Sequence, residues 1–159
     1  MNNSAWDFIK NKVLYVCQSG TSGYANAAKG YIYELLNKKI EVKSIQFSCD
    51  DSHKNQNTDF DIYINKTTST ELENPDTTII HATPDIWSKL IEDLKLKGGT
   101  IIGRTVWEFE KLLPEWVNCI NNSQVDFVSV PTEWNKDSFI KTDLLPAGIN
   151  EYINPYYQP

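Results

Sequence analysis

The sequence predicts an α/β domain with a Rossmann-like, doubly wound and mostly parallel sheet that carries helices on both faces. Short apolar runs rich in β-branched residues alternate with segments of helical periodicity, which is typical of parallel sheets. Small or polar residues follow several of these runs, where loops are expected. The chain has 159 residues and is 40% hydrophobic, which is enough for one core and rarely enough for two. Residues 1–159 are therefore assigned to a single domain.

The first strand and helix are predicted over residues 12–37. "KVLYVCQ" (12–18) is apolar and β-branched, as expected of a buried strand. Small and apolar residues then recur at helical spacing: Ala25, Ala28, Ile32, Leu35 and Leu36. Lys29 and Glu34 are expected off that apolar face, and Gly30 is interpreted as a packing contact.

The middle of the chain is expected to add three more strands. "IEVKSIQF" (40–47) alternates apolar and polar residues, and "FDIYIN" (60–65) is interpreted as a third strand. The polar stretch 48–59 between them, which includes His53, is expected to be a solvated surface loop. "TTIIHA" (77–82) is predicted as the fourth strand.

The second half repeats the alternation. Thr83 and Thr132 are expected to cap helices, and Pro84 and Pro114 are expected at first helical positions. Further strands are predicted over 98–105, 125–130 and 142–149. In the last helix, Trp134 and Phe139 are both expected to point inward.

Composition excludes several classes of partner and site. The formal net charge is −6, which argues against nucleic acid as the main partner. No apolar run approaches the roughly 20 residues that span a bilayer, and the N-terminus lacks the apolar core of a signal peptide. The three cysteines are far apart, and no Cys/His cluster indicates zinc or a disulfide framework. Cys17 and Cys119 are interpreted as buried thiols, and a reducing, cytoplasmic location is expected.

The glycine-rich loop "SGTSGYANAAKG" joins the first strand to its helix. Gly20 and Gly23 allow tight turns, and free N–H groups at a helix start favour an anion or a polar oxygen. The pattern is neither that of a dinucleotide-binding loop nor that of a P-loop. A simple strand-to-helix turn remains an equal alternative.

Two other segments that follow strands carry candidate chemistry. His81 lies at the predicted end of the fourth strand, where imidazole could act as a base or bind a sugar hydroxyl. A purely structural role remains open. Arg104, the only arginine, could bind a carboxylate or phosphate, or hold its loop through an ion pair with Glu108. Trp107 is interpreted as a core residue, with stacking on a sugar as the alternative.

Taken together, these segments resemble the N-terminal domain of GT-B retaining glycosyltransferases of the group 1, family 4-like type. "GYANAAKGY" is similar to the first helix of that family. The sharper similarity covers residues 103–136, with "GRTVWEFEKLLPEWVNCIN" followed by "VDFVSVPTEWNKDSFIK". "LLPAGINEYINPYYQP" resembles the segment that leads out of the family's N-terminal domain. Residues 40–75 add little.

The resemblance implies an acceptor-side domain whose partner domain binds a nucleotide-sugar donor. Residues 146–159 would begin the linker between the two, so this chain alone is expected to lack transfer activity. By position, His81 would lie near the acceptor hydroxyl. The other residues carried over would border the same cleft: Gly20, Thr21, Ser22, Gly23, Tyr24, Thr105 and Glu108. Arg104 joins them as a candidate substrate-binding residue because of its place after the fifth strand. Because retaining members are generally metal-independent, the resemblance implies no metal ligand and no cofactor.

Two alternatives to the transferase remain open. The chain could be a stand-alone, non-catalytic module that binds a glycan or a protein partner. It could also be a flavodoxin-like or nucleotide-binding domain, although a phosphate-loop signature is missing.

Overall fold

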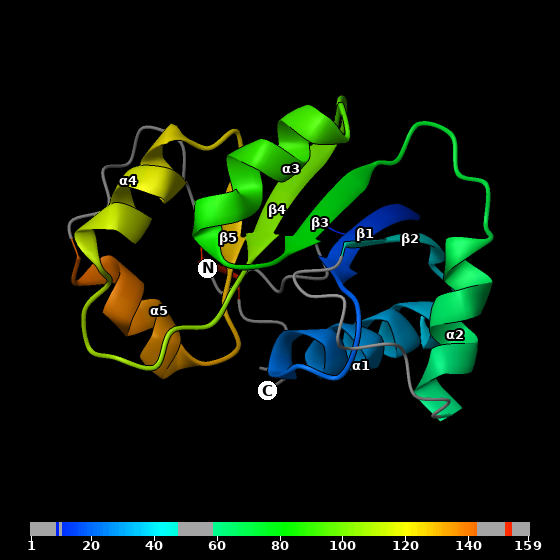
Figure 1. The fold of residues 1–159 in the computed structure, drawn as a ribbon, viewed down its shortest axis with the longest axis horizontal. Helices are drawn as coiled ribbons and strands as arrows, with labels where there is room; N and C mark the ends of the chain where they lie inside the picture. Colours follow the sequence, from blue (N-terminus) through cyan, green and yellow to red (C-terminus); the bar gives the residue numbers. More distant parts are fainter. Residues whose placement is uncertain (1–8, 10, 48–58, 143–151, 154–159) are drawn as a thin grey trace.

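The computed structural model describes residues 9, 11–47, 59–142 and 152–153. In this part of the chain, six strands form one sheet in the order β2-β1-β3-β4-β5-β6, and every neighbouring pair is parallel. The strands are β1 (Lys12–Gln18), β2 (Glu41–Phe47), β3 (Thr77–His81), β4 (Thr100–Arg104), β5 (Phe127–Ser129) and β6 (Tyr152–Ile153). The predicted α/β fold class with a parallel sheet is confirmed (Figure 1).

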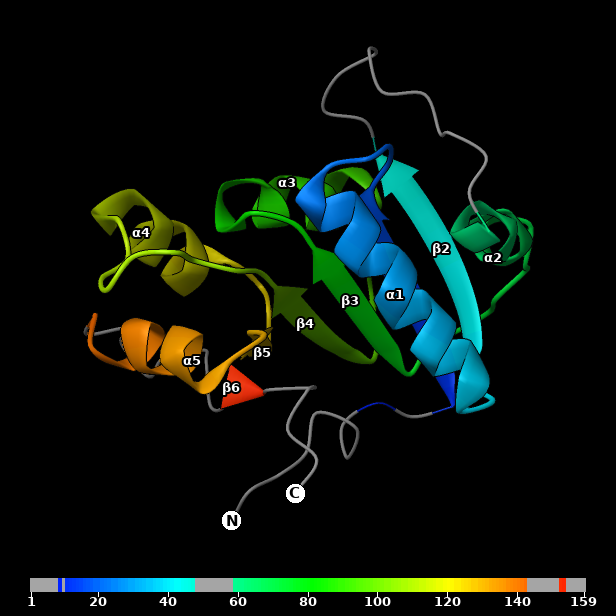
Figure 2. The same cartoon turned by 90° about the horizontal axis from the view of Figure 1, so that it is seen from below.

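Helices cover both faces of the sheet (Figures 1 and 2). They are α1 (Gly23–Asn37), α2 (Asp59–Thr68), α3 (Trp87–Asp93), α4 (Pro114–Asn122) and α5 (Glu133–Ile140), with a 3₁₀ turn, η2 (Pro84–Ile86), before α3. Neighbouring residues of a strand point to opposite faces. Ile79 accordingly joins the apolar cluster under α1 and α2, whereas Ile80 joins the cluster under α3 and α4.

Helix α1 corrects two expectations about its faces. Lys29 is buried, at 6% exposure, and not on the outer face. Its position explains this, because Lys29 lies four residues after Ala25 and three before Ile32, on the same side of the helix. Gly30 is not a packing contact, since a Cβ atom placed there meets no atom within 4 Å.

Residues 60–65 lie in helix α2, so the predicted third strand is wrong. An alternation over six residues does not separate a strand from a helix when no longer period is present. The buried residues Ile64 and Thr67 are three apart, as on one face of a helix. The Thr67 hydroxyl donates to the Ile64 carbonyl at 2.9 Å, which satisfies this polar group inside the helix.

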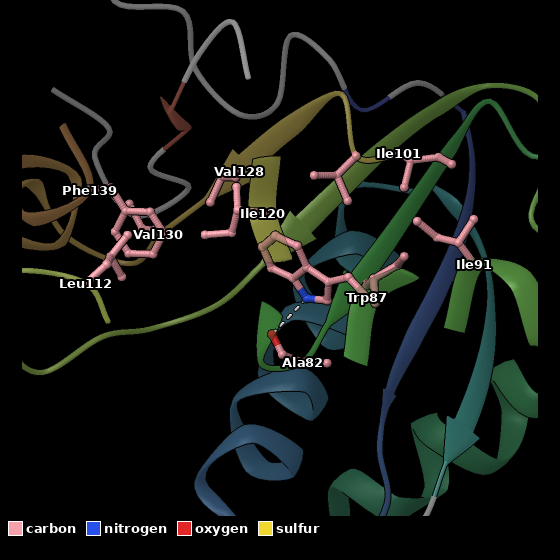
Figure 3. Close-up of a cluster of buried hydrophobic side chains, with 11 residues drawn as sticks. Ala82, Trp87, Ile91, Ile101, Leu112, Ile120, Val128, Val130 and Phe139 are labelled. Atoms are coloured by element: carbon pink, nitrogen blue, oxygen red, sulfur yellow. Dashed lines mark hydrogen bonds between the residues drawn. The ribbon is translucent and has the colours of Figure 1, made fainter. Parts of the chain in front are cut away.

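The cluster under α3 and α4 is built around Trp87 (Figure 3). Its indole is fully buried, and Nε1 donates to the Ala82 carbonyl at 3.0 Å. The ring lies against β4 at Gly103, where an added Cβ would stand 2.6 Å from ring atoms. A glycine in β4 is therefore required by the tryptophan on the next layer.

The helix starts of the second half lie where the sequence predicts them, but Thr83 and Trp134 depart from the expectations. The Thr132 hydroxyl accepts from Asn135 N at 3.1 Å and caps α5. Thr83 occupies the N-cap position before Pro84, but its side chain makes no capping hydrogen bond. Phe139 is buried, whereas Trp134 is 49% exposed. Positions five apart point about 140° away from each other on a helix, so both could not face the core.

Two sequence predictions lie outside the described residues. These are the last strand over 142–149, of which only Thr142 is described, and the solvated position of His53. The proposed linker 146–159 is described only at Tyr152 and Ile153, which form β6 beside β5.

Candidate functional site

A cavity of about 320 Å³ opens at the carboxyl ends of the parallel strands. Its lining includes Gly23, Tyr24, Tyr31, His81, Arg104, Thr105 and Glu108. Strand β1 lies between β2 and β3. After β1, the chain adds β2 on one side of it and then returns to add β3 on its other side. Open α/β sheets bind ligands at this kind of switch point, outside the carboxyl ends of the strands.

A single row of paired residues runs along the carboxyl edge of the sheet, and its two middle members, His81 and Arg104, form the floor of the cavity. Cys17 pairs with His81, His81 pairs with Arg104, and Arg104 pairs with Ser129 across β1, β3, β4 and β5. Paired residues of a parallel sheet point to the same face, with strands about 4.8 Å apart. The sheet register therefore places the imidazole and the guanidinium side by side under α1.

His81 is enclosed by three tyrosines. The rings of Tyr15, Tyr24 and Tyr31 have centroids 6.0, 5.5 and 5.8 Å from that of the imidazole. A 2.9 Å hydrogen bond joins the Tyr15 hydroxyl to Nδ1 of His81. Because that nitrogen is engaged inside the protein, Nε2 is the nitrogen left for a ligand.

Burial controls the protonation of His81. The residue is 5% exposed, and desolvation lowers the pKa of His81 to about 4. The ring is therefore neutral at pH 7. One of its nitrogens then donates and the other accepts, depending on the tautomer. A hydroxyl both donates and accepts, so it pairs with Nε2 in either case.

Arg104 supplies a positive charge at the floor of the cavity. Its guanidinium carbon lies 3.6 Å from the centroid of the Tyr31 ring, in a cation–π contact. NH1 donates to the Ser129 hydroxyl at 2.6 Å, and NH2 donates to the Tyr31 hydroxyl. Glu108 lines the same cavity, but its side chain is exposed at the rim. The guanidinium is thus held by α1 and β5.

Tyr24 joins the start of α1 to the loop that follows β4. Its hydroxyl hydrogen-bonds with the Thr105 hydroxyl at 2.9 Å and accepts from Val106 N at 3.3 Å. Burial is the main cause that raises the pKa of Tyr24. These contacts fix one wall of the cavity, and they explain how residues 81 positions apart in sequence come together.

The glycine-rich loop contributes to the cavity at one end only. Gly23 lines it, and a Cβ there would meet no atom within 4 Å, so the space in front of Gly23 is open. Gly20, Thr21 and Ser22 shape the turn instead. Gly20 has φ 96°, and the Ser22 hydroxyl accepts from Ala25 N and donates to Gln18. The loop is thus a capped strand-to-helix turn whose last residue reaches the cavity.

Three residues near the floor of the cavity are not among the site residues predicted from the sequence. Tyr15, Tyr31 and Ser129 contact His81 or Arg104, but each looks like an ordinary core or strand residue. Tyr31 follows Tyr24 by two helical turns, which is a signal that could have placed it on the same side. Trp107 packs on Trp116, with ring centroids 4.5 Å apart, in agreement with the preferred structural interpretation.

In the part of the chain that the structure describes, no group of three or more His, Cys, Asp or Glu side chains is arranged to hold a metal ion. No helix among those residues has the length and apolar character needed to cross a bilayer. Cys17 is buried, which raises the pKa of its thiol to about 12, and Cys119 is half-buried rather than fully buried.

Comparison with known proteins adds no relative. No protein-family model, no curated protein and no solved structure matches this chain.

Proposed function

We propose that this chain is the acceptor-side domain of a GT-B type glycosyltransferase, and that its cavity binds the sugar or other hydroxyl compound that receives the glycosyl group. One observation carries the proposal. Gly23, Tyr24, His81, Arg104, Thr105 and Glu108 come from separate segments and line one cavity. Apart from Arg104, these residues are ones that the resemblance in the sequence assigns to a shared cleft.

The chemistry of the cavity suits a hydroxylated ring. Tyr24 and Tyr31 offer aromatic surfaces, and sugars present apolar C–H faces together with hydroxyls. Nε2 of His81 is the hydrogen-bonding group for the reacting hydroxyl. Since the imidazole has a pKa near 4, it orients that hydroxyl at neutral pH and takes up a proton only weakly.

Open space beside Gly23 gives the donor a path to the acceptor. The nucleotide sugar would be held by a second domain, and its anomeric carbon must approach the carboxyl edge of this sheet. A Cβ atom at residue 23 would meet no other atom within 4 Å, so a side chain there begins in open space beside that path. Gly23→Val therefore adds bulk to the wall of the cavity from a position where the first added atom is not crowded.

The experiment is a glycosyl-transfer assay of the intact gene product with a panel of nucleotide sugars and acceptors. We expect Gly23→Val to lower transfer by roughly 100-fold, because small misplacements of reactants are that costly. Gly30→Ala is the matched control, since it adds a methyl group to the same helix outside the cavity. Equal transfer by wild type and Gly23→Val, or no transfer with any donor, would contradict the proposal.

A binding module is a second candidate, favoured by one observation. Phe109, Leu113, Trp134 and Ile140 are large apolar residues that are exposed in the loop after β4 and on α5. A partner that covered these side chains would remove their apolar area from water, which favours association. Phe109→Ser combined with Ile140→Ser should abolish partner capture if the chain is a module. The same variant should leave sugar binding unchanged if the cavity is the functional site.

A further inference from the structure

The floor of the cavity combines a positive charge with a neutral hydrogen-bonding ring. Arg104 and His81 are register partners on β4 and β3, and both line the cavity at 5% exposure. A guanidinium presents its N–H donors in a planar fork that matches a carboxylate or a phosphate. A sugar hydroxyl alone does not require such a group.

The residues around Arg104 hold its guanidinium in one buried position. Stacking on Tyr31 and donation to the Ser129 hydroxyl hold the guanidinium plane against α1 and β5. A charge that is held rigidly in a buried position interacts more strongly with an opposite charge than a surface lysine does. The orientation is also prepared in advance, which reduces the entropic cost of binding.

We propose that the acceptor carries an oxyanion, a carboxylate or a phosphate, which binds Arg104 while a hydroxyl on the same molecule binds Nε2 of His81. This inference rests on the proposed function, because it names the class of acceptor that the cavity takes. Neighbouring parallel strands are about 4.8 Å apart. An anionic substituent and a hydroxyl on a single sugar ring span that separation, so an acidic sugar fits the pair.

Two carboxylates near the mouth of the cavity oppose an anion, but more weakly. Glu108 lines the cavity, and Asp85 and Glu108 both raise the pKa of Tyr24 through their negative charge. Both side chains are exposed, so water and salt screen them. The buried guanidinium therefore decides the preference, and removal of the Glu108 charge should strengthen anion binding.

The test is calorimetric titration of this chain with glucuronate, glucose 6-phosphate, glucose and inorganic phosphate. We expect at least one acidic sugar to bind about 10- to 100-fold more tightly than glucose, which is the range of a charge-assisted hydrogen bond. Glucuronate and glucose 6-phosphate distinguish a carboxylate from a phosphate. Arg104→Gln should remove the difference in affinity between the acidic sugars and glucose. Lys66→Gln is the control, because it makes the same change of net charge at an exposed position of α2.

Variants that preserve the fold keep the test decisive if Arg104→Gln is unstable. Glu108→Gln at the exposed rim should tighten acidic-sugar binding by about 2- to 5-fold, and Gly23→Val should weaken it. Glucose binding as tightly as both acidic sugars would overturn the oxyanion inference and leave the proposed function standing. Inorganic phosphate binding as tightly as glucose 6-phosphate would overturn both, because the sugar would then contribute nothing.

Discussion

The two faces of the sheet are built for different purposes. Under α3 and α4, the cluster around Trp87 is apolar, and the indole nitrogen in it is satisfied by the Ala82 carbonyl. Under α1, the buried residues are mostly apolar but include His81, Arg104 and Ser129 at the carboxyl edge of the strands. Buried polar groups cost stability unless they are hydrogen-bonded. The first face therefore supplies stability, and the second uses some of it to hold polar groups beside a cavity.

The largest expected effect comes from removing the centre of the apolar face. Trp87→Ala should lower the free energy of unfolding by about 3–5 kcal/mol, because it deletes a fully buried ring and leaves a void against Gly103. Urea denaturation followed by circular dichroism measures the change. Trp134→Ala is the matched control, since the same substitution at a half-exposed residue should cost far less. Similar losses at the two positions would show that the apolar face does not dominate stability.

The next largest effect is a loss of folding stability at low pH, which comes from His81 on the face under α1. His81 has a pKa of about 4 in the folded chain against 6.5 for the free side chain, so the unfolded state binds its proton first as the pH falls. Stability from this group is fully present above pH 6.5 and is lost as the pH falls toward 4. The difference of two to three pKa units corresponds to about 3 kcal/mol. The neighbouring guanidinium of Arg104 does not titrate in this window.

Unfolding measurements at intervals between pH 7 and pH 4 test this dependence. His81→Gln can still hydrogen-bond with the Tyr15 hydroxyl but does not titrate, so its stability should fall less steeply than that of the wild type. Carboxylates contribute the same background to both proteins. Parallel curves for the two proteins would mean that His81 is more solvated than its 5% exposure indicates.

The same contrast explains which parts of the fold could be predicted. Strands β1, β3 and β4 are buried on both faces and appear in the sequence as apolar runs. Helix α2 lies beside β2 and packs on α1 (Figure 2). Its short pattern was mistaken for a strand, because six alternating residues carry too little periodicity. The large apolar side chain of Trp134 predicts burial, but its helical spacing from the buried Phe139 turns it toward solvent.

The proximity of candidate site residues could be predicted where topology alone brings them together. His81 and Arg104 end neighbouring parallel strands, so their proximity follows once the sheet order is known. Tyr15 and Tyr31 could not be identified this way. The contacts of Tyr31 depend on where α1 crosses the sheet, whereas Tyr15 lies in β1 and its long side chain reaches along the strand to His81. An aromatic residue on a buried face ordinarily signifies core packing. The environment of the imidazole is thus a tertiary property.

The smallest expected effect lies at Gly30, a half-buried position of α1 that does not line the cavity. Gly30→Ala should raise the free energy of unfolding by about 0.5–1 kcal/mol, because alanine loses less conformational entropy in a helix and its methyl group meets no atom. Gly103→Ala makes the same chemical change and should instead destabilise, since its Cβ would lie 2.6 Å from the Trp87 ring. Thermal denaturation of both variants measures the two signs. A loss of stability in Gly30→Ala would mean that α1 packs more closely at this position than the open space around Gly30 indicates. Residues on α1 would then tolerate added atoms as poorly as Gly103 does beneath Trp87 on the opposite face.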